Sequence, residues 1–151
     1  MEKPQMNREA REALIRRFAG KTVRICIDRP IGYVHHKEKY DLCYPINYGY
    51  VPGVLGGDGE ELDVYLLGVK TPEEAYDAHI IGVVRREDDV EDKLVGAPVG
   101  MVFTAAEVAR AVHFQEQYYR SEAEVFSAQF LRSRENSIDK APQSGYNKSS
   151  R

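Results

Sequence analysis

A succession of short segments with a β-type hydrophobic pattern, between residues 22 and 97, constrains the fold of this chain most strongly. In the first of them, Val23, Ile25 and Ile27 alternate with more polar residues, which is the period of a strand with one buried face. Further strands are predicted at residues 42–51, which are aromatic and extended, at residues 62–69, which form an apolar run typical of a buried strand, and at residues 78–84 and 94–97. Short strands in close succession, followed by a helix, predict a small β-barrel, closed or partly open, with helical cover.

Two helices are predicted at the ends of this series. Residues 7–18 carry an apolar stripe at helical spacing, with Asn7 placed as the N-cap and Gly20 as the stop signal. Thr104 and Glu107 form a capping-box pattern that predicts the start of a second helix. We expect this helix to continue, or to pair with another helical segment, around residues 125–130.

The connecting segments carry signals of their own. The basic stretch at residues 35–41 predicts a hairpin loop, and residues 52–61 include four glycines and predict a loop. Thr71, Pro72 and Glu74 form a capping-box pattern that predicts a short turn of helix. The length of 151 residues fits a single domain, which we expect to span residues 1–131. Residues 132–151 have almost nothing to bury and are predicted to be a disordered tail.

Charge and composition exclude several classes of protein. Lys and Arg total 21 against 24 Asp and Glu, so the basic surplus of a general nucleic-acid binder is missing. No apolar run approaches the ~20 residues of a membrane helix, and the charged N-terminus has no apolar core of a signal peptide. We therefore expect a cytoplasmic protein that binds neither nucleic acid nor membrane. Cys26 and Cys43 are expected to be buried free thiols rather than a disulfide.

Two acidic clusters are candidates for chemistry. Asp58, Glu60 and Asp63 follow the Gly-rich loop at the start of a buried strand, and residues 88–92 form a second acidic turn that leads into Lys93. Close carboxylates repel one another unless a cation neutralises them, and Mg²⁺ prefers carboxylate oxygens. If the two clusters meet at one rim of the barrel, they can hold several metal ions and clamp a phosphoryl group. Solvated acidic turns are the alternative for each cluster taken alone.

A tyrosine-rich segment precedes the first acidic cluster. Residues 44–50 read YPINYGY, and the hydroxyls of Tyr44, Tyr48 and Tyr50 can donate to phosphate oxygens, although strand tyrosines are often core residues with a hydrated tip. This segment, followed by a Gly-rich loop and DGEELDV, closely resembles the signature of the soluble family I inorganic pyrophosphatases.

The resemblance continues downstream in the same order, over roughly residues 22–120. The family's later motifs are matched by GVVRRED (82–88), EDKLVGAP (91–98) and HFQEQYY (113–119). It implies a mainly β fold with some α, an OB-like five-stranded barrel with an N-terminal helix and C-terminal helical cover. It also implies hydrolysis of pyrophosphate with several Mg²⁺ ions, by a metal-activated water, in a symmetric homo-oligomer.

Position by position, the resemblance assigns three roles. The expected metal ligands are Asp58, Asp63, Asp88 and Glu91. The expected phosphate-binding residues are Tyr44, Tyr48, Lys93 and Tyr118. Glu60 takes the position of the residue that orients or deprotonates the attacking water.

The chain also departs from the family pattern. It has Glu60 where the family has Asp, Glu61 where the family has Pro, and a second acidic turn that is shorter. Cys26 falls near the family's first-strand Glu, and the family's cations before the tyrosine motif have no clear counterpart. One of four residues in that segment is expected to supply the missing cation: His35, His36, Lys37 or Lys39.

Two other functions fit the same scaffold. One is a phosphohydrolase acting on a different diphosphate. The other is a non-catalytic barrel that binds phosphate or a nucleotide. Cys26 and the missing first-half cations favour the non-catalytic barrel. The pyrophosphatase is favoured by four retained residues: Asp58, Asp63, Asp88 and Lys93.

Overall fold

Residues 5–133 are described by the computed structural model of the chain, and they contain two long helices and eight strands. In chain order these elements are α1 (Arg8–Phe18), β1 (Thr22–Arg29), β2 (Val34–His36), β3 (Asp41–Cys43), β4 (Asn47–Leu55), β5 (Glu61–Leu66), β6 (Ala75–Arg86), β7 (Asp92–Ala97), α2 (Ala105–Glu116) and β8 (Ser121–Val125). A further helical segment covers residues 128–133.

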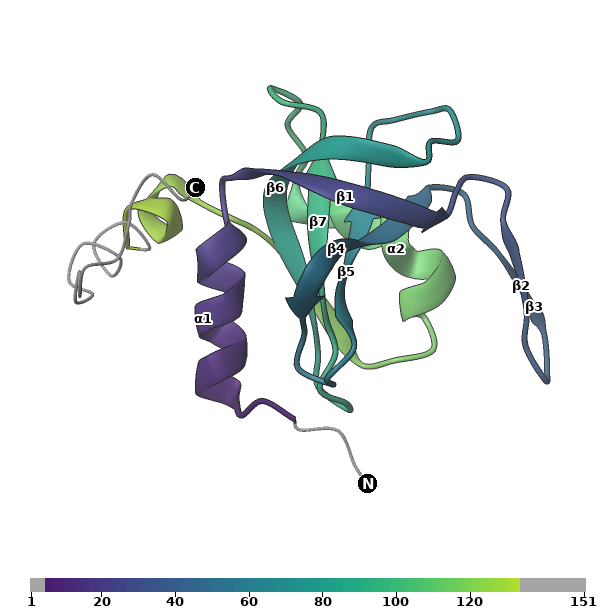
Figure 1. The fold of residues 1–151 in the computed structure, drawn as a ribbon, viewed down its shortest axis with the longest axis horizontal. Coiled ribbons are helices and arrows are strands. Elements are labelled where there is room, and N and C mark those ends of the chain that lie inside the picture. The colour runs from purple at the N-terminus through teal and green to yellow at the C-terminus, as the bar shows by residue number, and fades with distance from the viewer. Residues whose placement is uncertain (1–4, 134–151) are drawn as a thin grey trace.

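Five of the strands close into a barrel (Figure 1). They pair in the order β1-β4-β5-β7-β6, and β6 pairs back with β1, which leaves no gap between the first and last strands. β5 and β7 are parallel, whereas the other neighbours in the barrel are antiparallel. The prediction of a mainly β fold with an OB-like five-stranded barrel is confirmed.

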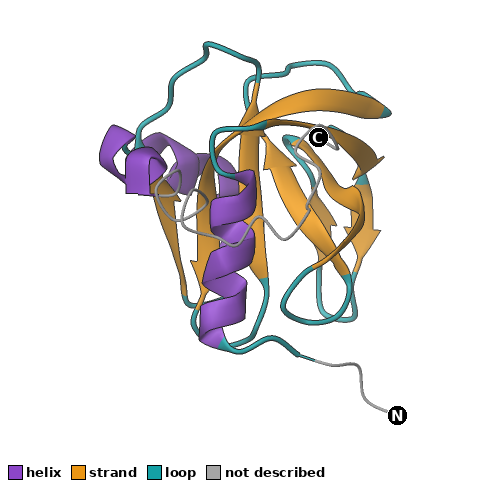
Figure 2. Cartoon of the chain, turned by 60° about the vertical axis from the view of Figure 1, so that its left-hand side comes forward, coloured by secondary structure: helices purple, strands orange, loops and turns teal. Residues whose placement is uncertain are grey.

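The strands bury side chains on both faces. Along β5, Val64 and Leu66 join a core cluster that includes Ile15 and Phe18 of α1, whereas Tyr65 joins a second cluster. The second cluster includes Val108 and Val112 of α2 and the tyrosines of the YPINYGY segment. α1 and α2 therefore cover different faces of the barrel wall, as Figures 1 and 2 show. This two-sided burial explains why residues 64–67 are apolar without interruption.

Both predicted helix starts are confirmed. Asn7 caps α1 by accepting a hydrogen bond from the Ala10 amide at 2.8 Å. Thr104 and Glu107 form the reciprocal capping box of α2. Each cap pairs amide groups that the first turn of a helix leaves without an intrahelical partner.

One helical prediction is wrong and another is confirmed only in part. Residues 71–74 are not helical; the Thr71 hydroxyl instead donates to Glu73 and the chain leads directly into β6. Continuation of α2 is wrong, because residues 121–125 form strand β8, which pairs antiparallel with β6, but the expected second helical segment is present at residues 128–133. Backbone pairing with an available sheet edge outweighed the local helical pattern there.

The basic segment at residues 35–41 forms a hairpin loop, as predicted. It joins β2 to β3, and the hairpin extends away from the barrel (Figure 1). Both cysteines are free, as expected, but neither is fully buried: Cys43 at the end of the hairpin is exposed and Cys26 is half-buried.

The approach of β1 to β4 depends on Gly49. A Cβ atom at this position would lie 1.8 Å from the carbonyl oxygen of Cys26, so a side chain cannot be accommodated without separating the strands. The glycine of the YPINYGY segment therefore allows the barrel to close beside the tyrosines.

The predicted tail from residue 132 lies outside the described residues except for residues 132 and 133, which belong to the last helical segment. Among the described residues, none of the helices has the length and apolar character to cross a membrane.

Candidate active site

The two acidic segments meet at one end of the barrel. The loop between β4 and β5 and the turn between β6 and β7 emerge at the same end, the lower end in Figure 1. Gly57 makes this contact possible, because a Cβ atom there would lie 2.3 Å from the carbonyl oxygen of Val90. Asp58, Asp63 and Glu91 line one small cavity between these segments.

Lys93 is the cation at the centre of this cluster. Its Nζ atom donates to Asp63 Oδ2 at 2.7 Å and to Glu91 Oε1 at 2.5 Å, while its side chain is only 4% exposed. Burial alone would lower the pKa of Lys93, but the charges of Asp63 and Glu91 outweigh burial and hold the pKa above its ordinary value. The ammonium is therefore charged and joins carboxylates from two acidic segments.

The cluster retains negative charge that Lys93 does not balance. Burial raises the pKa of Asp58, and the neighbouring charges of Glu91 and Asp63 raise it further. Burial also acts to raise the pKa of Glu91, but Lys93 and Arg86 together hold it below the ordinary value. Mutual repulsion of this kind is relieved by a bound cation.

The chemistry of these donors fits a divalent metal ion. Asp58, Asp63 and Glu91 offer hard carboxylate oxygens, the ligands that Mg²⁺ prefers. Within residues 5–133, however, no group of three or more His, Cys, Asp or Glu side chains already stands in the geometry of a metal site. In this structure the Lys93 ammonium lies between two of the three carboxylates.

Two tyrosines of the YPINYGY segment extend from the cluster into the barrel wall. The Lys93 Nζ lies 5.5 Å from the ring centre of Tyr48, which links Tyr48 to the acidic end. Burial and the charge of Asp63 raise the pKa of Tyr48 well above its ordinary value, so its hydroxyl stays protonated and able to donate. Tyr44 is fully buried, and its hydroxyl donates to Gln115 Oε1 at 2.9 Å.

Arg29 is a candidate that the sequence did not indicate. Its Nη1 atom donates to the Tyr44 hydroxyl at 2.5 Å and lies 3.3 Å from His35 Nδ1, and its guanidinium lies 5.8 Å from the ring centre of Tyr48. The Arg29 side chain is half-buried among the tyrosines. It therefore places a cation beside the tyrosines, a role expected from one of the basic residues between 35 and 39. No local pattern marks Arg29, because it is the last residue of β1 and meets the tyrosines only through the pairing of β1 with β4.

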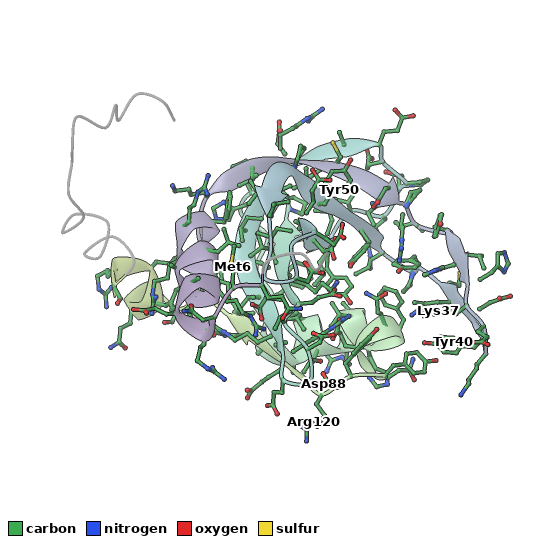
Figure 3. The ribbon with its side chains drawn as sticks, turned by 60° about the horizontal axis from the view of Figure 1, so that its bottom comes forward. Met6, Lys37, Tyr40, Tyr50, Asp88 and Arg120 are labelled. Atoms are coloured by element: carbon green, nitrogen blue, oxygen red, sulfur yellow. The ribbon has the colours of Figure 1, made fainter. Side chains whose placement is uncertain are left out.

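Three expected site residues are not among those that line the cavity formed by Asp58, Asp63 and Glu91. Asp88 is exposed and accepts from the Arg120 amide at 3.1 Å, and Figure 3 shows the two residues together at the edge of the molecule. The Tyr118 ring stacks on Tyr40 of the hairpin at 4.5 Å. Glu60 has an exposed side chain, and its amide donates to Asp58 Oδ1 at 3.0 Å. The structure therefore brings Asp58, Asp63, Glu91, Lys93 and Tyr48 together. The Glu60 backbone adjoins Asp58, whereas Asp88 and Tyr118 contact other residues.

Comparison with solved structures shows the same fold. The chain is similar to the inorganic pyrophosphatase from Ehrlichia chaffeensis, with a TM-score of 0.56 and 18% identity over 76% of this chain and 94% of that one. It is also similar to the inorganic pyrophosphatase from Coxiella burnetii, with a TM-score of 0.53 and 18% identity over 79% of this chain and 94% of that one.

The sequence relatives are also inorganic pyrophosphatases, but they match a shorter part of this chain. An inorganic pyrophosphatase of Helicobacter pylori is 33% identical over 63 residues, which cover 39% of this chain and 36% of the relative. One of Haemophilus influenzae is 42% identical over 59 residues, which cover 36% of this chain and 33% of the relative. The matched stretch thus spans about a third of the length of these relatives.

A family model described as inorganic pyrophosphatase matches residues 17–134, which include the barrel, both acidic segments and α2. The match covers most of the chain and includes every residue that forms the acidic end of the barrel. The chain therefore belongs to the inorganic pyrophosphatase family.

Proposed function

We propose that this protein hydrolyses inorganic pyrophosphate to two phosphates with the help of Mg²⁺. The observation that carries the proposal is the junction of both acidic segments around the buried ammonium of Lys93, in a chain of this family. Pyrophosphate is a small polyanion, so a site for it needs cations that face its oxygens and a set of anions that retain metal ions.

The residues of the chain divide into two functions in this proposal. Asp58, Asp63 and Glu91 would hold Mg²⁺, because they share one cavity and carry charge that Lys93 alone does not balance. When bound, Mg²⁺ would neutralise phosphate oxygens and lower the pKa of a coordinated water. Lys93 and the Tyr48 hydroxyl would donate to phosphate oxygens at the same end of the barrel.

Arg29 extends the phosphate-binding surface. We infer that it is the cation that replaces the missing family cations, because its guanidinium lies over Tyr48 and beside His35. Tyr44 would then act through Arg29, since its buried hydroxyl already contacts Arg29 and Gln115. This arrangement places a fixed, permanently charged group next to the tyrosines.

The reaction itself is a hydrolysis. The oxygen of water forms a bond to one phosphorus, the bond from that phosphorus to the bridging oxygen breaks, and the second phosphate leaves with the electron pair. Glu60 is proposed to orient the water or accept its proton. Asp88 as a fourth metal ligand and Tyr118 as a phosphate ligand are supported by the resemblance of their segments to the family motifs.

A phosphate-release assay with the purified full chain tests the proposal. We expect phosphate from pyrophosphate only when Mg²⁺ is present. Release from a nucleoside diphosphate but not from pyrophosphate would identify the alternative phosphohydrolase. Tight binding of pyrophosphate without any phosphate release would identify a non-catalytic phosphate-binding barrel. The expected cytoplasmic location and homo-oligomeric assembly stay predictions, which cell fractionation and light scattering would test.

A further inference from the structure

A buried ion pair joins the barrel to α2 directly behind the acidic cluster. Arg86, at the end of β6, donates to both carboxylate oxygens of Glu116, from Nε at 3.1 Å and from Nη2 at 2.8 Å. Their side chains are only 3% and 5% exposed. The Tyr65 hydroxyl donates to the same carboxylate at 2.6 Å, and the Tyr119 ring lies 3.6 Å from the guanidinium. These contacts fix the position of the Arg86 guanidinium.

The remaining nitrogen of Arg86 faces the acidic turn. Nη1 lies 3.4 Å from Asp89 Oδ2 and 3.5 Å from Glu91 Oε1. Asp89 in turn accepts from the Glu91 amide through Oδ1 at 2.9 Å. Arg86 therefore reaches Glu91 by two routes: directly through its side chain, and through Asp89 to its backbone.

Both cations near Glu91 contact the same oxygen. Lys93 lies 2.5 Å and Arg86 3.5 Å from Oε1, so the carboxylate is held in one orientation from two sides. The Arg86 contact is longer than the 2.7–2.9 Å that is usual for a charge-assisted hydrogen bond. The Arg86 side chain therefore restrains the orientation of the Glu91 carboxylate, but it binds the carboxylate less tightly than Lys93 does.

We propose that Arg86, anchored by Glu116, is a positioning residue that orients Glu91 for metal binding. This inference rests on the proposed function, because it assumes that Glu91 is a metal ligand. Partners behind a ligand commonly change metal affinity by about 10- to 100-fold when they are removed. Because Glu116 lies on α2, the orientation of Glu91 would depend on how that helix packs against the barrel.

The test is Mg²⁺ binding by the full chain, measured by titration calorimetry and by the rise of the melting temperature with Mg²⁺. The variant Arg86→Met/Glu116→Gln removes one positive and one negative charge, so the net charge of the neighbourhood is unchanged. It also avoids leaving one buried charge without its partner. We expect its dissociation constant for Mg²⁺ to rise by about 10- to 100-fold.

Arg85→Met/Glu124→Gln is the matched control. Arg85 is the preceding residue on β6 and pairs with Glu124 and Glu12 instead of the acidic turn. This control also removes one positive and one negative charge from an ion pair made by β6, in this case with β8, and its Mg²⁺ affinity should equal that of the wild type. Equal losses in the two double variants would show a general effect of stability and would overturn the inference.

Three further outcomes distinguish this inference from the proposed function. If Arg86→Met/Glu116→Gln does not fold, Arg86→Lys keeps the charge but cannot hold Glu116 and reach Glu91 at once, so its Mg²⁺ affinity should still fall. Wild-type affinity in either Arg86 variant would overturn the role of Arg86 while the proposed function stands. A wild-type protein that neither binds Mg²⁺ nor releases phosphate would refute the proposed function and this inference together.

Discussion

Lys93 donates to Asp63 Oδ2 across 2.7 Å, and this contact joins two parallel strands, β5 and β7. The register pairs Val64 with Leu94, so the residues before them lie side by side at the same end of the barrel. Because Lys93 is buried, the contact is shielded from solvent and is stronger than a surface pair.

Replacing Lys93 with methionine tests this contact. The variant loses the cation between Asp63 and Glu91, so we expect phosphate release from pyrophosphate to fall on the order of 100-fold. The variant also loses two hydrogen bonds to charged groups, each of which contributes about 1.5–3 kcal/mol, so the free energy of unfolding should fall as well. A phosphate-release assay measures the first effect, and urea unfolding measures the second. Lys70→Met, at an exposed position, is the control, and full activity of Lys93→Met would contradict the proposed site.

Gly57→Ala tests the junction of the acidic segments. The added Cβ would lie 2.3 Å from the Val90 carbonyl oxygen and 3.2 Å from Arg11, so the loop must move away from the turn. We expect a loss of about 1–3 kcal/mol in stability and weaker Mg²⁺ binding. Gly56→Ala is the control, because its nearest neighbour, Leu62, would lie at an ordinary 3.4 Å. Unchanged Mg²⁺ binding in Gly57→Ala would show that the two segments act separately.

Arg29→Met tests the cation among the tyrosines. Losing a charged donor to phosphate should raise the KM for pyrophosphate by about 10- to 100-fold, because such a hydrogen bond contributes about 1.5–3 kcal/mol. Mg²⁺ binding should not change, since Arg29 contacts His35 and the tyrosines and is not among the residues that line the acidic cavity. Arg24→Met, on the same strand but exposed and paired with Asp77, is the control. A wild-type KM in Arg29→Met would remove Arg29 from the substrate site.

Glu60→Asp tests the residue proposed to act on water. The shorter side chain moves the carboxylate by about 1 Å, and a displacement of that size can cost on the order of 100-fold in rate. The Glu60 amide and carbonyl are held by Asp58 and Gly56, so the substitution should act through the side chain alone. We expect lower activity, because the loop and the shortened turn are fitted to the longer residue.

Two results would contradict that expectation for Glu60. Higher activity in Glu60→Asp would show that the longer side chain of Glu60 holds the carboxylate in a suboptimal position in the natural chain. Unchanged turnover in Glu60→Ala would remove Glu60 from the mechanism.

The ion pair between Glu12 and Arg85 predicts a pH dependence of stability. The hydrogen bond from Arg85 lowers the pKa of Glu12 below its ordinary value of 4.5, although burial opposes this. A lowered pKa in the folded state contributes stability above the ordinary pKa, and this contribution is lost as the pH falls through the folded-state pKa. The melting temperature of the wild type should exceed that of Glu12→Gln by ~2–4 °C at neutral pH. The difference should disappear in strong acid, and a constant difference would contradict the prediction.

Local patterns determined most of the elements of this fold. The caps at Asn7 and Thr104 were visible in the sequence because a helix start needs acceptors within a few residues. The period-two pattern of β1 was visible because burial alternates along a single strand. The two acidic segments and Lys93 could be named from the sequence and the family resemblance, since their motifs are contiguous.

Strand pairing determined what the local patterns could not. Residues 121–125 form a strand because β6 offers a free edge, and Gly82 lets the two strands approach, with a Cβ there only 2.3 Å from the Glu124 carbonyl oxygen. The sequence of residues 121–125 indicates neither the free edge of β6 nor the close approach of the two strands at Gly82. A short segment of this kind takes the conformation that its partner requires.

The sequence by itself therefore determined which residues carry the carboxylates and the buried strands, because hydrophobic period and capping act over a few neighbours. Only the tertiary structure decided which charges face one another. Arg29 reaches the tyrosines through the pairing of β1 with β4, and Arg86 reaches Glu116 only because α2 packs on the barrel. Electrostatic contacts depend on distances between atoms, and those distances are set by register and packing across the whole barrel.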